Sequence, residues 1–124
     1  MTETILITGG YGASQSAELL HPWSGASCEL PALPDQRKYH TQAGARLCGG
    51  WGSSTARSCL QWSVEAGDWV RLPFSLAKKR YLHSSWSPPK GGTFLYGGLR
   101  DGYTAELVRN ESSTIAFKMK NDML

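Results

Sequence analysis

The chain has 124 residues and a formal net charge of +3, with 40% hydrophobic and 19% charged residues. This composition excludes an intrinsically disordered chain, which combines low hydrophobicity with high net charge. No run approaches the roughly 18 apolar residues of a membrane-spanning helix, and the basic residues are too scattered for the stripe that nucleic-acid binding uses. Residues 1–4 lead directly into an apolar stretch, so we expect no secretory signal within this chain.

Fourteen glycines and six prolines separate short apolar stretches, a pattern that predicts many short strands joined by turns. The first group of expected strands comprises 4–9, 16–21 and 27–31. The second comprises 40–44, 45–49, 58–63 and 68–72. The third comprises 82–87, 93–97, 104–109 and 114–119. No inner strand precedes residue 4, and residues 121–124 are too short and polar to supply one.

Two landmarks recur along these groups at intervals of roughly 40 to 50 residues, the length of a propeller blade. The first is a double glycine at the end of an apolar strand: Gly9-Gly10, Gly49-Gly50 and Gly97-Gly98. The second is an Arg-x-x-His turn: Arg37 with His40, and Arg80 with His83. Two unrelated features that recur in one order indicate an internal repeat.

The order of Gly-Gly, a second strand, Gly-x-Trp and Arg-x-x-His resembles the kelch repeat. The middle unit is the most similar, with Trp69 in Gly67-Asp68-Trp69. The resemblance covers about residues 4 to 119 and implies an all-β protein of kelch-type propeller blades, each a four-stranded antiparallel sheet. We expect units at 4–37, 38–80 and 81–119 within one partial propeller, 1–124, and a tail at 120–124.

Three blades are too few for a ring, because closed propellers typically have four to eight. The outer faces of the first and last blades would then be exposed, which calls for a partner. We therefore expect an incomplete propeller or one completed by self-association, in which two copies make six blades.

Three cysteines are present: Cys28, Cys48 and Cys59. None lies in a Cys-x-x-Cys pair, so we expect no metal site. Cys48 and Cys59 fall on adjacent predicted strands, within reach of a disulfide that would place the protein in an oxidising compartment. The alternative is two small buried apolar residues of a cytosolic protein. A disulfide would leave Cys28 without a partner.

Several polar residues suit structural roles. The recurrence of Arg37, His40, Arg80 and His83 indicates one task repeated in each unit, which is to fix the turn into the next blade. Glu18 and Glu106 also recur, and we expect them to bond backbone amides or arginines across blades. Asp35 follows Pro34 in a turn, where aspartate commonly bonds its own backbone.

Loops around the channel of a propeller commonly carry its function. The loops that follow the double glycines contain aromatic and arginine residues, the types that anchor protein interfaces. The alternative is that these aromatic side chains pack within the blade. The candidate partner-binding residues are Tyr11, Trp51, Arg57, Arg100, Asp101 and Tyr103.

The chain contains no nucleophile elbow, phosphate-binding loop or dinucleotide fingerprint. We therefore expect no catalytic residue and no cofactor, and predict a non-enzymatic protein-interaction or scaffold module, with an unidentified protein partner, from an extracellular kelch propeller. One alternative is an intracellular substrate-recognition module of a ubiquitin ligase. Another is a fragment of a kelch-fold oxidase or sugar-active enzyme.

Overall fold

The computed structural model describes residues 4–52, 55–89, 91–98, 104–110 and 112–118. These described residues form eleven strands and no helix, so none of them belongs to a helix that is long and apolar enough to cross a membrane. The strands make three antiparallel sheets, which confirms the predicted all-β fold of propeller-like blades.

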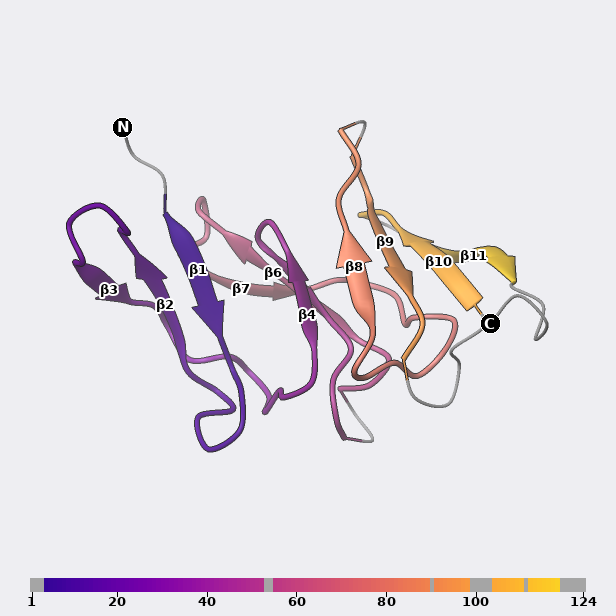
Figure 1. The fold of residues 1–124 in the computed structure, drawn as a ribbon, viewed down its shortest axis with the longest axis horizontal. Helices are drawn as coiled ribbons and strands as arrows, with labels where there is room; N and C mark the ends of the chain where they lie inside the picture. The colour runs from indigo at the N-terminus through magenta and orange to yellow at the C-terminus, as the bar shows by residue number, and fades with distance from the viewer. Residues whose placement is uncertain (1–3, 53–54, 90, 99–103, 111, 119–124) are drawn as a thin grey trace.

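Each sheet corresponds to one predicted unit and is called blade 1, 2 or 3 in chain order (Figure 1). Blade 1 contains β1 (Ile5–Thr8), β2 (Ala17–Leu20) and β3 (Ser27–Glu29). Blade 2 contains β4 (Thr41–Ala43), β5 (Arg46–Cys48), β6 (Cys59–Ser63) and β7 (Asp68–Arg71). Blade 3 contains β8 (Ser84–Trp86), β9 (Thr93–Tyr96), β10 (Thr104–Val108) and β11 (Ser113–Lys118). Each predicted strand is confirmed, and only its end residues differ.

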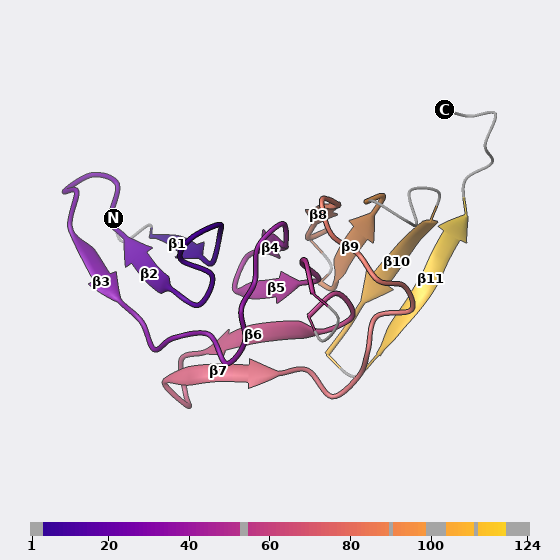
Figure 2. The ribbon, with the colours of Figure 1, turned by 90° about the horizontal axis from the view of Figure 1, so that it is seen from below.

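The blades stand side by side in an open row, with blade 2 between the other two (Figure 2). The strands of each sheet are ordered as they occur along the chain, and the inner strands β4 and β8 contact each other. Within the described residues the three sheets do not close a ring. Blade 1 and blade 3 therefore each have one face that no other blade covers.

The core lies between the blades rather than within them. One apolar cluster joins blades 1 and 2 and comprises Ala17, Leu33, Leu47, Leu60 and Trp69. A second cluster joins blades 2 and 3 and comprises Cys48, Cys59, Leu72, Leu76, Leu95 and Val108. Side chains alternate between the faces of a strand, so Leu47 and Cys48 of β5 enter different clusters. Both faces of blade 2 are thus covered by neighbouring blades, as expected for a repeat unit that cannot bury its faces alone.

The predicted disulfide between Cys48 and Cys59 is confirmed. The two residues face each other on β5 and β6, with their Cα atoms 4.2 Å apart. Such a short separation is typical of a non-hydrogen-bonded antiparallel pair. Cys28 is exposed and unpaired.

The double glycines of blades 1 and 2 are the points at which each of these blades contacts the turn that enters the next blade. Gly9 has a φ of 60°, and a Cβ atom there would lie 2.5 Å from the carbonyl oxygen of Arg37. The N–H of Gly10 donates to that same oxygen at 2.9 Å. Gly49 and Gly50 hold the turn at Arg80 in the same way. Glycine is needed here because a side chain would exclude the approaching backbone.

Candidate binding face

Two predicted loop aromatics lie on the surface at neighbouring blades. Tyr11 follows the double glycine of blade 1 and is 82% exposed, and Trp51 follows that of blade 2 and is 51% exposed. Arg57 is also exposed, and its Nε donates to the carbonyl oxygen of Leu76 at 2.9 Å. The other three predicted residues, Arg100, Asp101 and Tyr103, lie outside the described residues.

A groove of about 740 Å³ brings the two aromatics together. Three segments that are distant in sequence line it: the loop of blade 1, the loop of blade 2 and the turn between these blades. We call this surface the binding face, and its lining residues are Tyr11, Gly12, Ser14, Gln36, Arg37, Lys38, Trp51, Gly52 and Thr55. The groove thus exists only where two blades meet.

Lys38 places a positive charge beside the aromatic rings of the binding face. Its Nζ lies 4.7 Å from the ring centroid of Tyr11 and 5.7 Å from that of Tyr39. Both distances suit a cation–π interaction. No carboxylate among the described residues pairs with this ammonium group. Its charge is therefore available to a ligand in the groove.

Trp51 is held in place while half of its surface remains open. Its ring makes edge contacts with Tyr39, at 6.5 Å between centroids, and with Tyr81, at 5.0 Å. Its backbone N–H donates to the carbonyl oxygen of Lys38 at 2.8 Å, and its own carbonyl accepts from Thr55 Oγ1 at 2.9 Å. The indole thus packs against its neighbours and also presents an ordered surface.

The two Arg-x-x-His turns, which carry Tyr39 and Tyr81, share an unusual backbone conformation. Tyr39 and Leu82 occupy equivalent places before His40 and His83, and both have a left-handed φ, of 59° and 55°. This conformation costs a residue with a side chain roughly 1–2 kcal/mol. The N–H of Leu82 donates to the carbonyl oxygen of Tyr39 at 2.9 Å, which ties the turns together.

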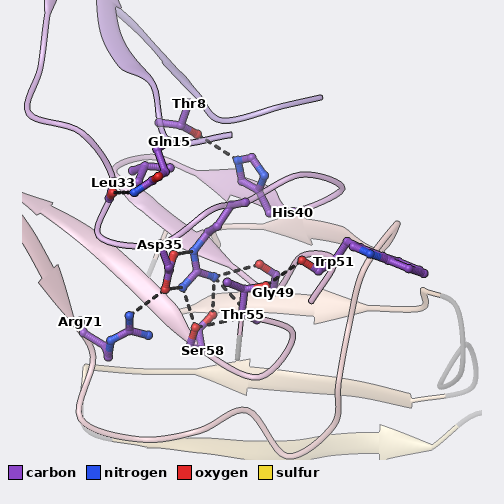
Figure 3. Close-up of polar contacts among 11 residues, drawn as sticks. Thr8, Gln15, Leu33, Asp35, His40, Gly49, Trp51, Thr55, Ser58 and Arg71 are labelled. Carbon is purple, nitrogen blue, oxygen red and sulfur yellow. Dashed lines mark hydrogen bonds and ion pairs between the residues drawn. The ribbon is translucent and has the colours of Figure 1, made fainter. Parts of the chain in front are cut away.

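Arg37 forms the floor of the groove and is fully buried. Its Nη1 donates to the carbonyl oxygens of Gly49, Thr55 and Ser58, at 2.9, 3.3 and 2.9 Å (Figure 3). These carbonyls belong to the loop that carries Trp51, so the guanidinium fixes that loop. Burial lowers the pKa of Arg37, an effect that the negative charge of Asp35 opposes.

Asp35 departs from the expectation that it bonds its own backbone. Its carboxylate accepts from Arg37 Nε at 2.9 Å and from Arg71 Nη2 at 2.7 Å (Figure 3). A fully buried guanidinium needs a counter-ion, and Asp35 stands two residues before it on the same turn. The local Pro-Asp pattern alone did not indicate this ion pair.

Arg80 repeats the arrangement in blade 3 with a different counter-ion. Its Nη1 donates to the carbonyl oxygens of Gly97 and Thr104, at 3.0 and 3.1 Å. Its Nη2 lies 3.3 Å from Glu106 Oε2, and both side chains are fully buried. Glu106 also accepts from the N–H of Ala77 at 3.1 Å. Glu106 therefore bonds both a backbone amide and an arginine.

The two repeated histidines lie under the turns. His40 Nε2 is 3.0 Å from Thr8 Oγ1, and His83 Nε2 is 2.7 Å from Thr41 Oγ1. Burial and the nearby charge of Arg80 lower the pKa of His83 to about 4, and burial and Arg37 lower that of His40. Both rings are therefore neutral near pH 7, and each holds a threonine of a neighbouring strand or blade.

Within the described part of the chain, no three His, Cys, Asp or Glu side chains form a group that could hold a metal ion. Sequence reasoning missed Lys38, which lines the binding face, and also Tyr39 and Tyr81, whose rings contact Trp51. All three lie inside the repeated Arg-x-x-His turns, whose middle positions are the available signal. No known protein-family model and no curated protein matches this chain.

Proposed function

We propose that this chain is a non-enzymatic protein-interaction module of a kelch-type propeller and that it binds its partner through the binding face. The observation that carries the proposal is the pair of exposed aromatics, Tyr11 and Trp51, in one groove beside the ammonium of Lys38, which pairs with no carboxylate among the described residues. Large ordered aromatics with a polar edge are the residues that commonly dominate binding energy at protein interfaces.

The chemistry of the groove favours an extended polypeptide segment that carries a carboxylate. Such a segment would stack apolar atoms on the rings of Tyr11 and Trp51, while its carboxylate pairs with Lys38. The charged residues that line the groove are Arg37 and Lys38. The guanidinium of Arg37 is occupied by backbone carbonyls and by Asp35, so Lys38 supplies the available charge. This arrangement supports recognition rather than acid–base catalysis.

The disulfide between Cys48 and Cys59 supports an extracellular origin for the parent protein, because such bonds persist in oxidising compartments. The test is the intact mass of protein from an oxidising host, after thiol alkylation with and without reduction. Two protected cysteines, mapped to this pair, are expected. Three alkylated thiols without reduction would favour the intracellular ubiquitin-ligase alternative.

The binding proposal is tested by selection from a displayed library of random peptides on the immobilised full chain. Peptides enriched on the wild-type protein should contain acidic residues and should lose affinity roughly 10-fold or more for Tyr11→Ala and Trp51→Ala. Val64→Ala is the matched control, because Val64 is 83% exposed at a turn of blade 2 outside the groove. Equal binding to all variants would refute the proposal.

A further inference from the structure

Blade 1 exposes an apolar surface whose counterparts in blades 2 and 3 are buried. Ile7 stands two residues before its double glycine, as Leu47 and Leu95 do in blades 2 and 3. Ile7 is 42% exposed, and its neighbour Ile5 is 48% exposed, whereas Leu47 and Leu95 are both 0% exposed. In those blades the covering group includes a linker leucine, Leu33 or Leu76.

The inner edge of β1 is also open. Gly9 N–H donates to the carbonyl oxygen of Ser16, so by alternation Leu6 and Thr8 direct their backbone groups away from β2. In blades 2 and 3, β4 and β8 occupy this edge. In blade 1 the only described group there is the side chain of Gln42, whose Nε2 donates to Leu6 O at 2.7 Å.

Blade 3 shows how such a face is covered. The segment before β8 inserts Arg80, which donates to the carbonyls of Gly97 and Thr104 and pairs with Glu106. Three residues earlier, the N–H of Ala77 donates to Glu106. The carboxylate of Glu106 accepts a further bond from Ser113 Oγ at 2.9 Å.

Blade 1 carries the same set of acceptors without the arginine. By strand register, Gly9, Ser16, Glu18 and Ser27 stand where blade 3 has Gly97, Thr104, Glu106 and Ser113. No described residue bonds or pairs with the half-buried carboxylate of Glu18. Glu29 lies directly opposite Glu18 on the same face, which adds a second negative charge.

Blade 2 explains why the match with blade 3 is specific. At the place of Glu106 it has Leu60, and its entering linker has Pro34 at the place of Ala77. Proline has no N–H to donate, and the counter-ion of Arg37 is instead Asp35 of the linker. The blade with a carboxylate at this strand position, Glu106, is therefore the one whose linker has a backbone N–H three residues before the arginine. Glu18 selects a linker of the blade 3 kind.

We propose that the uncovered face of blade 1 is a second binding site and that it takes an Arg-x-x-His segment of a separate polypeptide. The guanidinium bonds the carbonyls of Gly9 and Ser16 and pairs with Glu18. An N–H three residues earlier donates to Glu18, an apolar residue covers Ile7, and the residues after the histidine pair with β1. Strand addition of this kind combines backbone bonds with side-chain selection.

The charges on blade 1 bear on the partner segment. The acidic pair of Glu18 and Glu29 matches the basic run Lys78-Lys79-Arg80 of the segment that covers blade 3. Charge complementarity thus identifies the kind of partner.

The probe is a fluorescein-labelled peptide with the sequence of residues 76–87, titrated with the full chain and followed by fluorescence polarisation. Replacing the peptide's arginine with glutamine, or Glu18→Gln in the protein, should each weaken binding roughly 10- to 100-fold. Glu65→Gln is the charge-matched control at an exposed turn of blade 2 and should bind normally. A peptide with the sequence of residues 33–44, which carries Pro34, should bind more weakly than the first.

Glu18→Gln should leave the melting temperature unchanged, because no described residue bonds or pairs with the carboxylate of Glu18. Failure of the peptide to bind, or equal affinity for wild type and Glu18→Gln, would overturn the proposal. Sedimentation velocity covers the other occupant. A dimer of the chain that Glu18→Gln dissociates would assign the site to a second copy and would also overturn it.

Discussion

Gly9→Ala tests whether the turn at Arg37 is as closely held by blade 1 as the structure shows. The matched control is Gly44→Ala, because both glycines have a φ of 60°. Nothing lies within 4 Å of a Cβ atom at Gly44, whereas at Gly9 it would lie 2.5 Å from Arg37 O and 2.7 Å from His40 Cε1. The pair thus separates backbone conformation from the close approach of two blades.

Both substitutions place alanine in the left-handed region, which costs about 1 kcal/mol. Gly9→Ala must also displace the turn and strain the 2.9 Å bond from Gly10 N–H to Arg37 O. Overpacking of this kind adds about 1–3 kcal/mol. We expect the free energy of unfolding to fall by about 3 kcal/mol for Gly9→Ala and about 1 kcal/mol for Gly44→Ala, measured by urea unfolding with tryptophan fluorescence. Losses that agree within about 0.5 kcal/mol would refute the close approach.

Replacing both Cys48 and Cys59 with alanine should lower the free energy of unfolding by roughly 3 kcal/mol, because the bond joins residues 11 apart in sequence. Dithiothreitol should destabilise the wild type and not this variant, and a wild type indifferent to dithiothreitol would contradict the prediction. The free energy of unfolding should fall by about 3 kcal/mol as the pH drops from 6.5 towards 4. The pKa of His83 is lowered to about 4 in the folded protein, so over this range the unfolded chain binds a proton that the folded chain does not. Urea midpoints across that range should flatten in His83→Gln, and an unchanged slope would exclude this residue as the cause. Glu106→Gln should cost about 3–5 kcal/mol by leaving the buried charge of Arg80 unpaired, whereas Glu18→Gln at the equivalent place should cost almost nothing. Similar urea midpoints for these two variants would show that the buried pair contributes no stability.

The strands and their grouping into blades could be predicted because the same sequence landmarks recur in each unit. A double glycine marks the end of the second strand in blade 2, and the pairs in blades 1 and 3 confirm its meaning. The disulfide could be anticipated because Cys48 and Cys59 flank one loop between adjacent strands. Local rules suffice where a single hairpin determines the geometry.

The binding face could not be predicted in full, because it forms from parts of two blades. Lys38 and Tyr39 lie between Arg37 and His40, whose recurrence indicates a structural role. Nothing in this pattern distinguishes the two residues between them as part of a binding surface. Their placement depends on the left-handed φ of Tyr39 and on how closely the turn approaches Gly9 and Gly50. Asp35 was missed for a related reason, since its partners Arg37 and Arg71 meet only after the blades have stacked.

The geometry of the binding face is therefore a consequence of blade stacking. The turn at Arg37 contacts Gly9 of blade 1, while its guanidinium bonds the loop of blade 2 that carries Trp51. Tyr11 and Trp51 belong to different blades, and Lys38 stands on the turn between them. Any change that separates blade 1 from blade 2 must therefore open the groove as well as the core. Stability and recognition depend on the same contacts in this chain, because the residues that bury Arg37 also position the aromatic rings.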